Sequence, residues 1–196
     1  MPTNWIELDS QAVQVSVELA ARVRAADLSR PTPCAGWTVD DLLAHMTAQH
    51  YGFAAASRGD GDLARWKPRP LRQDPVGSYR ASADHVLSAF AADGVLDQVF
   101  PLPELGRSVP GAQGVSFHFI DYVVHSWDLA KALGVEVEFA PELLEAGLAV
   151  ATAVPDGKAR LAPGASFAPA LAWTGGSRLD EIVAILGRSP RWPEID

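Results

Sequence analysis

The chain has 196 residues, 48% of them hydrophobic, and a formal net charge of -8. A chain of this length and composition can form one sizeable domain that is stable without disulfides or a structural metal. The acidic balance, with no clustered Lys/Arg patch, argues against a nucleic-acid-binding surface. Cys34 is the only cysteine, which excludes an intrachain disulfide and a CxxC redox or zinc motif.

The N-terminal stretch MPTNWIELDSQ does not look like a targeting signal. It lacks a basic segment followed by an apolar core, and no apolar run of about 18 residues occurs in the chain. These observations predict a cytoplasmic protein without a membrane partner.

The apolar spacing predicts six helices joined by loops. Asp9 or Ser10 could cap the first helix, and Thr38 with Asp41 forms the [ST]-x-x-[DE] pattern that starts the second. Gly134 and Gly187 stand where helix-ending glycines are expected. The expected helices span about 9–26, 38 to 57–59, 75–92, 112–133, 141–154 and 177–186.

The segments between the helices are rich in proline and glycine. Residues 59–75 are predicted to form a surface loop, and residues 96–111 to hold one or two short strands or an extended excursion. Four long amphipathic helices with so few strands predict an all-α four-helix bundle. We expect a single domain over 1–196, with the bundle at about 9–134 and a C-terminal extension with shorter helices at about 135–196.

Four polar residues share one face of the fourth expected helix, in HFIDYVVHSWDLAKALG. Asp121 and His125 are four residues apart, so they lie about 40° apart around the helix and one turn above each other. His118 precedes this pair by three residues and Asp128 follows it by three. Apolar side chains border the stripe, so it is not an ordinary solvated face.

A carboxylate and an imidazole one turn apart can supply two metal ligands, with a third from another helix. His45, beside the apolar line of the second helix, is the best candidate for that third ligand. The alternative is that Asp121 is only a buried partner that fixes the tautomer of His125. His118 could be a packing residue, and Asp128 either an ion-pair partner or a group that orients a ligand.

Two stretches then resemble a known family. TPCAGWTVDDLLAHM (residues 32–46) resembles the TPC-x-GW-x-V-x-DL-x-x-H signature of the DinB/YfiT-like metal-binding superfamily. More narrowly, it is similar to the actinobacterial branch related to the N-terminal domains of mycothiol-dependent maleylpyruvate isomerases. DYVVHSWDLAKALG (residues 121–134) resembles the second signature of that branch, and LGRSPRW (residues 186–192) the tail of its uncharacterised members.

The resemblance implies an up-down-down-up four-helix bundle that binds a divalent metal, zinc or nickel, through His45, Asp121 and His125. Asp121 stands where the isomerase pattern has Glu, so the metal could sit differently. A small-molecule substrate and a low-molecular-weight thiol are the implied partners, and a homodimer is compatible with the pattern.

The implied activity is a metal-dependent, thiol-using isomerase or S-transferase. A metal bound by three protein ligands keeps an open position, where a thiol can be deprotonated to a nucleophile. The alternatives are a metal-dependent hydrolase and a non-catalytic protein that binds a metal or a small molecule. Cys34 as a nucleophile is the weaker hypothesis, because it lies in the turn before a capped helix.

Overall fold

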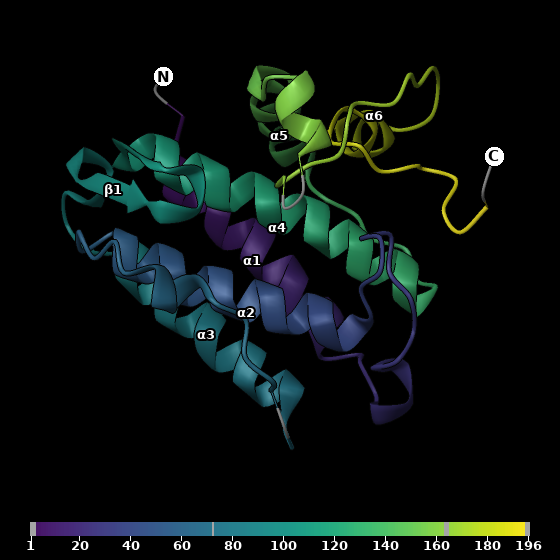
Figure 1. Ribbon diagram of the computed structural model, residues 1–196, viewed down its shortest axis with the longest axis horizontal. Coiled ribbons are helices and arrows are strands. Elements are labelled where there is room, and N and C mark those ends of the chain that lie inside the picture. Colours follow the sequence, from purple (N-terminus) through teal and green to yellow (C-terminus); the bar gives the residue numbers. More distant parts are fainter. Residues whose placement is uncertain (1–2, 72, 163–164, 195–196) are drawn as a thin grey trace.

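The computed structural model describes residues 3–71, 73–162 and 165–194. Figure 1 shows an all-α bundle with one small hairpin at its end. The helices are α1 (Trp5–Ala20), α2 (Val39–Ala56), α3 (Pro75–Phe90), α4 (Gly111–Leu133), α5 (Pro141–Ala153) and α6 (Arg178–Ile185), and the strands are β1 (Val99–Leu102) and β2 (Arg107–Pro110).

The four long helices run along the length of the molecule (Figure 1). α1 and α4 run in one direction, and α2 and α3 run in the opposite direction, which is the expected up-down-down-up order. β1 pairs antiparallel with β2, from Val99 opposite Pro110 to Leu102 opposite Arg107. The short strands therefore form where the sequence predicted them, and they close the end of the bundle at which α4 begins.

α1 begins earlier than the sequence suggested. Asn4 is its N-cap, with the side-chain oxygen accepting a hydrogen bond from the Glu7 amide. Asp9 is therefore not a cap: it lies within the first two turns of α1, and its side chain is fully buried. The expected start was wrong because Asn, Asp and Ser are all good caps and three of them occur within a few residues. α1 also ends at Ala20 rather than at residue 26.

The other helix ends follow the expected signals closely. Thr38 and Asp41 form a complete capping box at α2, and Ser177 and Asp180 form another at α6. Gly134 ends α4 with a φ of 71°, a left-handed conformation that a side chain would strain. These local signals depend only on residues within one turn, so the sequence is enough to predict them.

Residues 59–75 are predicted to form a surface loop, but part of this segment is buried. They contain the 3-10 turn Leu63–Trp66, and Trp66 is only 2% exposed. A Cβ on Gly52 of α2 would lie 2.3 Å from the indole ring of Trp66, so only glycine at position 52 allows this packing. The loop thus contributes a buried aromatic ring to the bundle.

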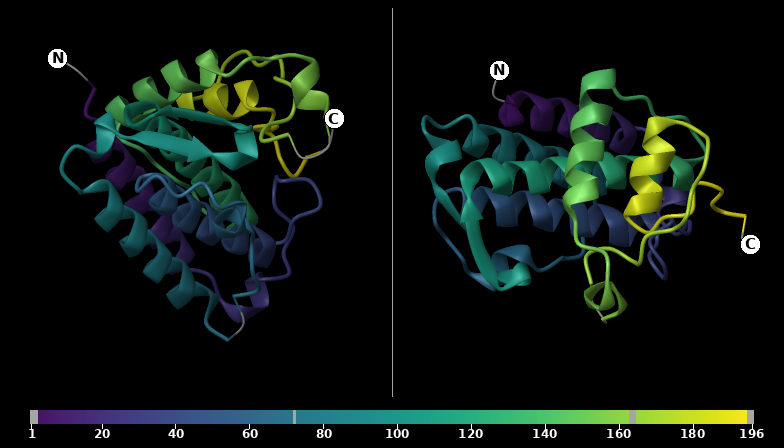
Figure 2. Two further views of the ribbon diagram at one scale, coloured as in Figure 1. Left: turned by 60° about the vertical axis from the view of Figure 1, so that its left-hand side comes forward. Right: turned by 90° about the horizontal axis from the view of Figure 1, so that it is seen from above.

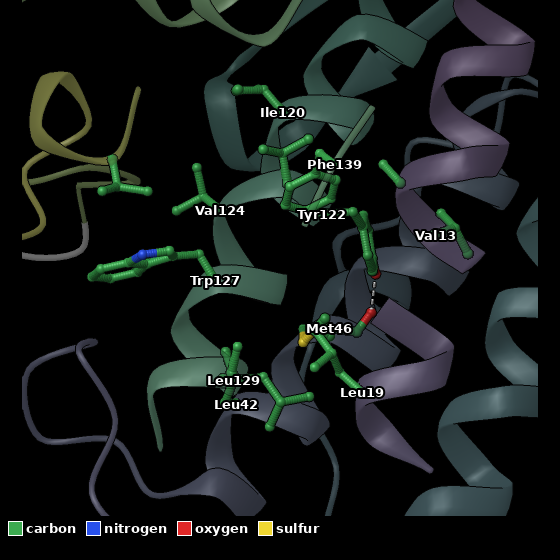
Figure 3. Close-up of a cluster of buried hydrophobic side chains, with 14 of the residues drawn as sticks. Val13, Leu19, Leu42, Met46, Ile120, Tyr122, Val124, Trp127, Leu129 and Phe139 are labelled. Atoms are coloured by element: carbon green, nitrogen blue, oxygen red, sulfur yellow. Dashed lines mark hydrogen bonds between the residues drawn. The ribbon is translucent and has the colours of Figure 1, made fainter. Parts of the chain in front are cut away.

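The core between α1, α2 and α4 is apolar but contains one polar tether. Figure 3 shows Leu19 of α1 grouped with Leu42, Met46 and Leu129. The hydroxyl of Tyr122, on the same helix as the expected ligands, donates a hydrogen bond of 2.5 Å to the carbonyl of Met46. This bond satisfies a buried hydroxyl and ties α4 to α2 at the level where the polar stripe lies.

The C-terminal helices pack on the outer side of α4 (Figure 1), and the view from above in Figure 2 shows α5 crossing the bundle steeply with α6 beside it. Leu143 of α5 and Ile182 of α6 are almost fully buried and belong to the same apolar cluster as the bundle core. None of the described helices is long and apolar enough to cross a membrane.

Candidate metal centre

Two helices bring the three expected ligands together. His45 comes from α2, and Asp121 and His125 come from α4, one turn apart. A ligand atom of each lies within 4.8 Å of the ligand atoms of the other two. The imidazole rings of His45 and His125 meet edge to face with centroids 5.0 Å apart. An ion held by all three residues would lie about 2.0–2.2 Å from each ligand atom.

The electrostatics of the cluster favour a cation between the side chains. Burial and the nearby positive charge of His125 lower the pKa of His45 to about 4, so its imidazole is neutral at physiological pH. Burial alone would raise the pKa of Asp121, but His125 and His45 outweigh it and lower that pKa to about 2. One neutral imidazole and one carboxylate are the ionisation states that metal ligation requires.

His125 is held from both sides of its ring. Its Nδ1 atom lies 2.9 Å from Oδ2 of Asp128, and its Nε2 atom lies 3.4 Å from Oδ1 of Asp121. Burial by itself lowers the pKa of His125, but the carboxylates of Asp121 and Asp128 outweigh it and raise that pKa. The pocket therefore stabilises one positive charge at this position, which either an imidazolium or a bound cation supplies.

Asp128 is in turn held by a residue that sequence reasoning did not single out. Arg188, after α6, donates from Nη2 to Oδ2 of Asp128 at 3.2 Å and from Nε to Oδ1 at 3.5 Å. Asp128 is fully buried and Arg188 is 9% exposed. Arg188 and Asp128 are 60 positions apart, so helical spacing gave no signal for this pair. Only the resemblance of LGRSPRW to a family tail marked the segment.

Cys34 contacts both members of the Asp128–Arg188 pair. Its thiol donates to Oδ2 of Asp128 at 3.1 Å, and its sulfur accepts from Nη2 of Arg188 at 3.5 Å. Cys34, His125 and Asp128 also form a group with ligand atoms within 4.8 Å. His125 thus belongs to two clusters, one on each ring nitrogen.

Unused hydrogen-bonding capacity distinguishes the two clusters. On the Nδ1 side, Asp128 already pairs with Arg188, His125 and Cys34. On the Nε2 side, the buried Oδ2 atom of Asp121 has no hydrogen-bond partner among the described residues. A buried carboxylate oxygen without a partner is costly unless something else binds it. His45, Asp121 and the Nε2 atom of His125 are therefore the group that fits a metal ion.

His118 lies on the same face of α4 but bonds elsewhere. Its Nδ1 atom is 2.6 Å from Oδ1 of Asp9, and its Nε2 atom is 3.1 Å from Nδ1 of His50. All three side chains are fully buried. His118 therefore belongs to a separate polar chain that links α1, α4 and α2, and its hydrogen bonds to Asp9 and His50 do not orient a metal ligand.

Comparison with known proteins agrees with this architecture. Residues 10–130 match the family model described as the mycothiol maleylpyruvate isomerase N-terminal domain. The chain belongs to this family. It is 35% identical over 188 residues to the uncharacterized proteins Rv0738 and MT0763 of two Mycobacterium tuberculosis strains, H37Rv and CDC 1551, with 88% of this chain and 91% of each relative covered.

Solved structures share the fold of this maleylpyruvate isomerase N-terminal domain family. The mycothiol-dependent maleylpyruvate isomerase superposes with a TM-score of 0.57 at 18% identity, covering 76% of this chain and 68% of that chain. A DinB-like protein of Bacillus subtilis superposes with a TM-score of 0.54 at 15% identity, covering 70% of this chain and 96% of that chain. The expected family and the expected mostly α-helical, DinB-like fold are thereby confirmed.

Proposed function

We propose that His45, Asp121 and His125 hold a divalent metal ion, zinc or nickel, and that the protein uses it in the cytoplasm for thiol-dependent isomerase or S-transferase chemistry on a small molecule. The observation that carries the proposal is the convergence of two imidazoles and one carboxylate from two helices, with the buried Oδ2 atom of Asp121 left without a partner. The name of the related mycothiol-dependent isomerase supports a thiol as co-substrate.

The donor set fits such an ion. Two nitrogen ligands and one carboxylate are typical of catalytic zinc sites, which keep one position open. When bound, a divalent metal supplies Lewis-acid chemistry and lowers the pKa of a thiol or a water. When His125 is neutral, its Nδ1–H donates to Asp128, and the lone pair on Nε2 of His125 faces His45 and Asp121. The aspartate at position 121 is shorter than the glutamate of the related pattern, but its Oδ1 atom already lies 3.4 Å from that nitrogen.

Metal content tests the assignment directly. We expect the purified protein to bind about one equivalent of zinc or nickel by elemental analysis, and His125→Ala or His45→Ala to lose most of it. His85→Ala is the matched control, because His85 is exposed on α3 and belongs to neither cluster. Unchanged metal content in His125→Ala, or none in the wild type, would overturn the site.

Thiol binding tests the chemistry separately. Calorimetry with mycothiol should show binding to the metal-loaded protein and none to the chelator-treated protein, because the metal is the expected anchor of the sulfur. Glutathione serves as a comparison thiol of different structure. Stoichiometric metal with no affinity for either thiol would contradict the thiol-dependent role and favour a non-catalytic metal-binding protein. Turnover of an ester or an amide by such a protein would favour a hydrolase instead.

A further inference from the structure

A cavity of about 600 Å³ adjoins the candidate metal centre at Asp121. It extends toward the hairpin end of the bundle, because Gln49 and Phe53 follow His45 on α2 at intervals of four residues and Phe117 precedes Asp121 by four on α4. α5 and the segment around Phe167 cover the other side. Its volume is typical of pockets that hold a small organic molecule.

The walls of this cavity are mainly apolar. Aromatic rings line it from several elements: Trp5, Phe53, Trp66, Phe117 and Phe167. Ala149 and Val150 of α5 add aliphatic surface. Apolar area of this kind contributes about 25 cal/mol per Å² when a ligand removes it from water. A hydrated, multiply charged molecule would lose solvation here without regaining it.

Two polar atoms of lining residues are buried without a hydrogen-bond partner among the described residues: the acceptor Oδ2 of Asp121 and the donor Nε1 of Trp66. A hydroxyl group can pair with either kind of atom. Glu104 accepts a hydrogen bond of 2.9 Å from Nε2 of Gln49, whose side chain is 6% exposed. With Asp121, Glu104 places two carboxyl groups in the lining, against one arginine, Arg107. Glu104 and Arg107 are both exposed, and Arg107 stacks over Phe117 at 5.7 Å. This arrangement favours a ligand that donates a hydrogen bond over one that carries two carboxylates.

We propose that this cavity binds a bulky, largely aromatic small molecule that carries one neutral hydrogen-bond donor, such as a hydroxyl group, and that it discriminates against small dicarboxylates. The proposal that the cavity binds a ligand depends only on the residues that line it. That the ligand is the substrate of the metal centre rests on the function proposed above, because Asp121 is shared by the two.

Binding of matched probes tests the proposal without turnover, thiol or metal. 2-Naphthol presents a neutral donor, 2-naphthoate presents the same rings with an anion, and maleate is a small dicarboxylate. Calorimetry on the chelator-treated full-length protein should give the tightest binding for 2-naphthol, at least tenfold weaker binding for 2-naphthoate, and none for maleate. Equal or tighter binding of 2-naphthoate or maleate would overturn the proposal.

Variants locate the binding. Ala149→Asp adds a charge to the cavity wall and should weaken 2-naphthol binding at least tenfold, because the apolar ligand would desolvate the new carboxylate. Thr152→Asp makes the same change of net charge on the same helix, at an exposed position outside the lining, and should bind like the wild type. Equal affinity of the two variants would show that the probe binds elsewhere. These outcomes are independent of metal content, so failure of the metal assignment can be told apart from failure of the pocket.

Discussion

Asp128 does not belong to the proposed ligand set of the candidate metal centre, but it orients the imidazole ring of His125, which does. Its Oδ2 atom lies 2.9 Å from Nδ1 of His125, so the neutral imidazole must carry its proton there and present a lone pair at Nε2. Replacing that carboxylate with a neutral amide should weaken metal binding although no ligand is lost. Groups in this position typically contribute about 10–100-fold in metal affinity.

We therefore expect Asp128→Asn to bind zinc about 10–100-fold more weakly, measured by competition with a chromophoric chelator. Ser126→Ala is the control, since Ser126 is equally buried on the same helix and its hydroxyl has no hydrogen-bond partner among the described residues. An affinity of Asp128→Asn within about twofold of the wild type would contradict the positioning role.

The single variant also leaves the buried Arg188 without its anion, so stability and positioning must be separated. The double variant Asp128→Asn with Arg188→Met removes both buried charges and should recover much of the thermal stability. It should not recover zinc affinity, because the acceptor for Nδ1 of His125 is still altered. Recovery of both together would mean that Asp128 acts only through folding.

At this scale, the sequence could place Asp121 and His125 on one helix face because their spacing is local. It could not show that His118 bonds to Asp9 and His50 rather than joining the same site. Nor could it pair Arg188 with Asp128, which depends on how the C-terminal segment returns to α4. Tertiary contacts of this kind leave no periodic signal in a single sequence.

Among the helices, a buried polar chain joins three elements of the bundle: Asp9 of α1, His118 of α4 and His50 of α2. His50 stacks on Tyr122 with ring centroids 4.1 Å apart, and its Nε2 atom has no hydrogen-bond partner among the described residues. Burial, and then the charge of His118, lower the pKa of His50 well below its ordinary value. His50 is therefore neutral in the folded protein at physiological pH.

This depressed pKa makes the bundle sensitive to acid. The unfolded chain takes up a proton at His50 near pH 6.5, whereas the folded chain resists it, so the stabilisation present above about pH 6.5 is lost as the pH falls. Each pH unit of this linkage corresponds to about 1.4 kcal/mol at most. Comparing the wild type with a variant at this one position removes the contributions that the two proteins share.

His50→Phe keeps an aromatic ring against Tyr122 and removes the titration. We expect it to be less stable than the wild type at pH 7.5, because the Nε2 atom of His118 loses its partner, by about 1–3 kcal/mol. The difference should shrink as the pH falls toward 5, measured by urea unfolding at each pH. A difference that stays constant or grows on acidification would be inconsistent with a neutral, proton-resisting His50.

The boundaries of the elements show the limit of local signals. Where one capping pattern stands alone, as at Thr38 and Asp41, the predicted start is confirmed. Where several caps compete, as at Asn4, Asp9 and Ser10, the choice depends on which side chain the tertiary structure buries. Asp9 is fully buried against His118, 109 positions away, and a contact at that separation leaves no local signal in the sequence.

For the molecule as a whole, the C-terminal extension is part of the bundle core in structural terms. Ile182 of α6 is fully buried in the cluster that also contains Ile120 and Val124 of α4. The same extension supplies Arg188 to the candidate metal centre. The chain should therefore unfold as one cooperative unit, and a destabilising substitution in α6 should lower the unfolding midpoint of the whole bundle.

Ile182→Ala tests this. Loss of a fully buried Ile side chain typically costs about 2–5 kcal/mol, and the absence of a Cβ on neighbouring Gly147 leaves little to refill the space. If the molecule is one unit, the whole transition shifts, so that far-ultraviolet circular dichroism and tryptophan fluorescence give the same lowered midpoint. If α5 and α6 instead formed an independent unit, the bundle would keep the wild-type midpoint and a separate earlier transition would appear. Coincident probes in the variant would mean that the packing of α6 helps to determine the stability of the helices that present His45, Asp121 and His125.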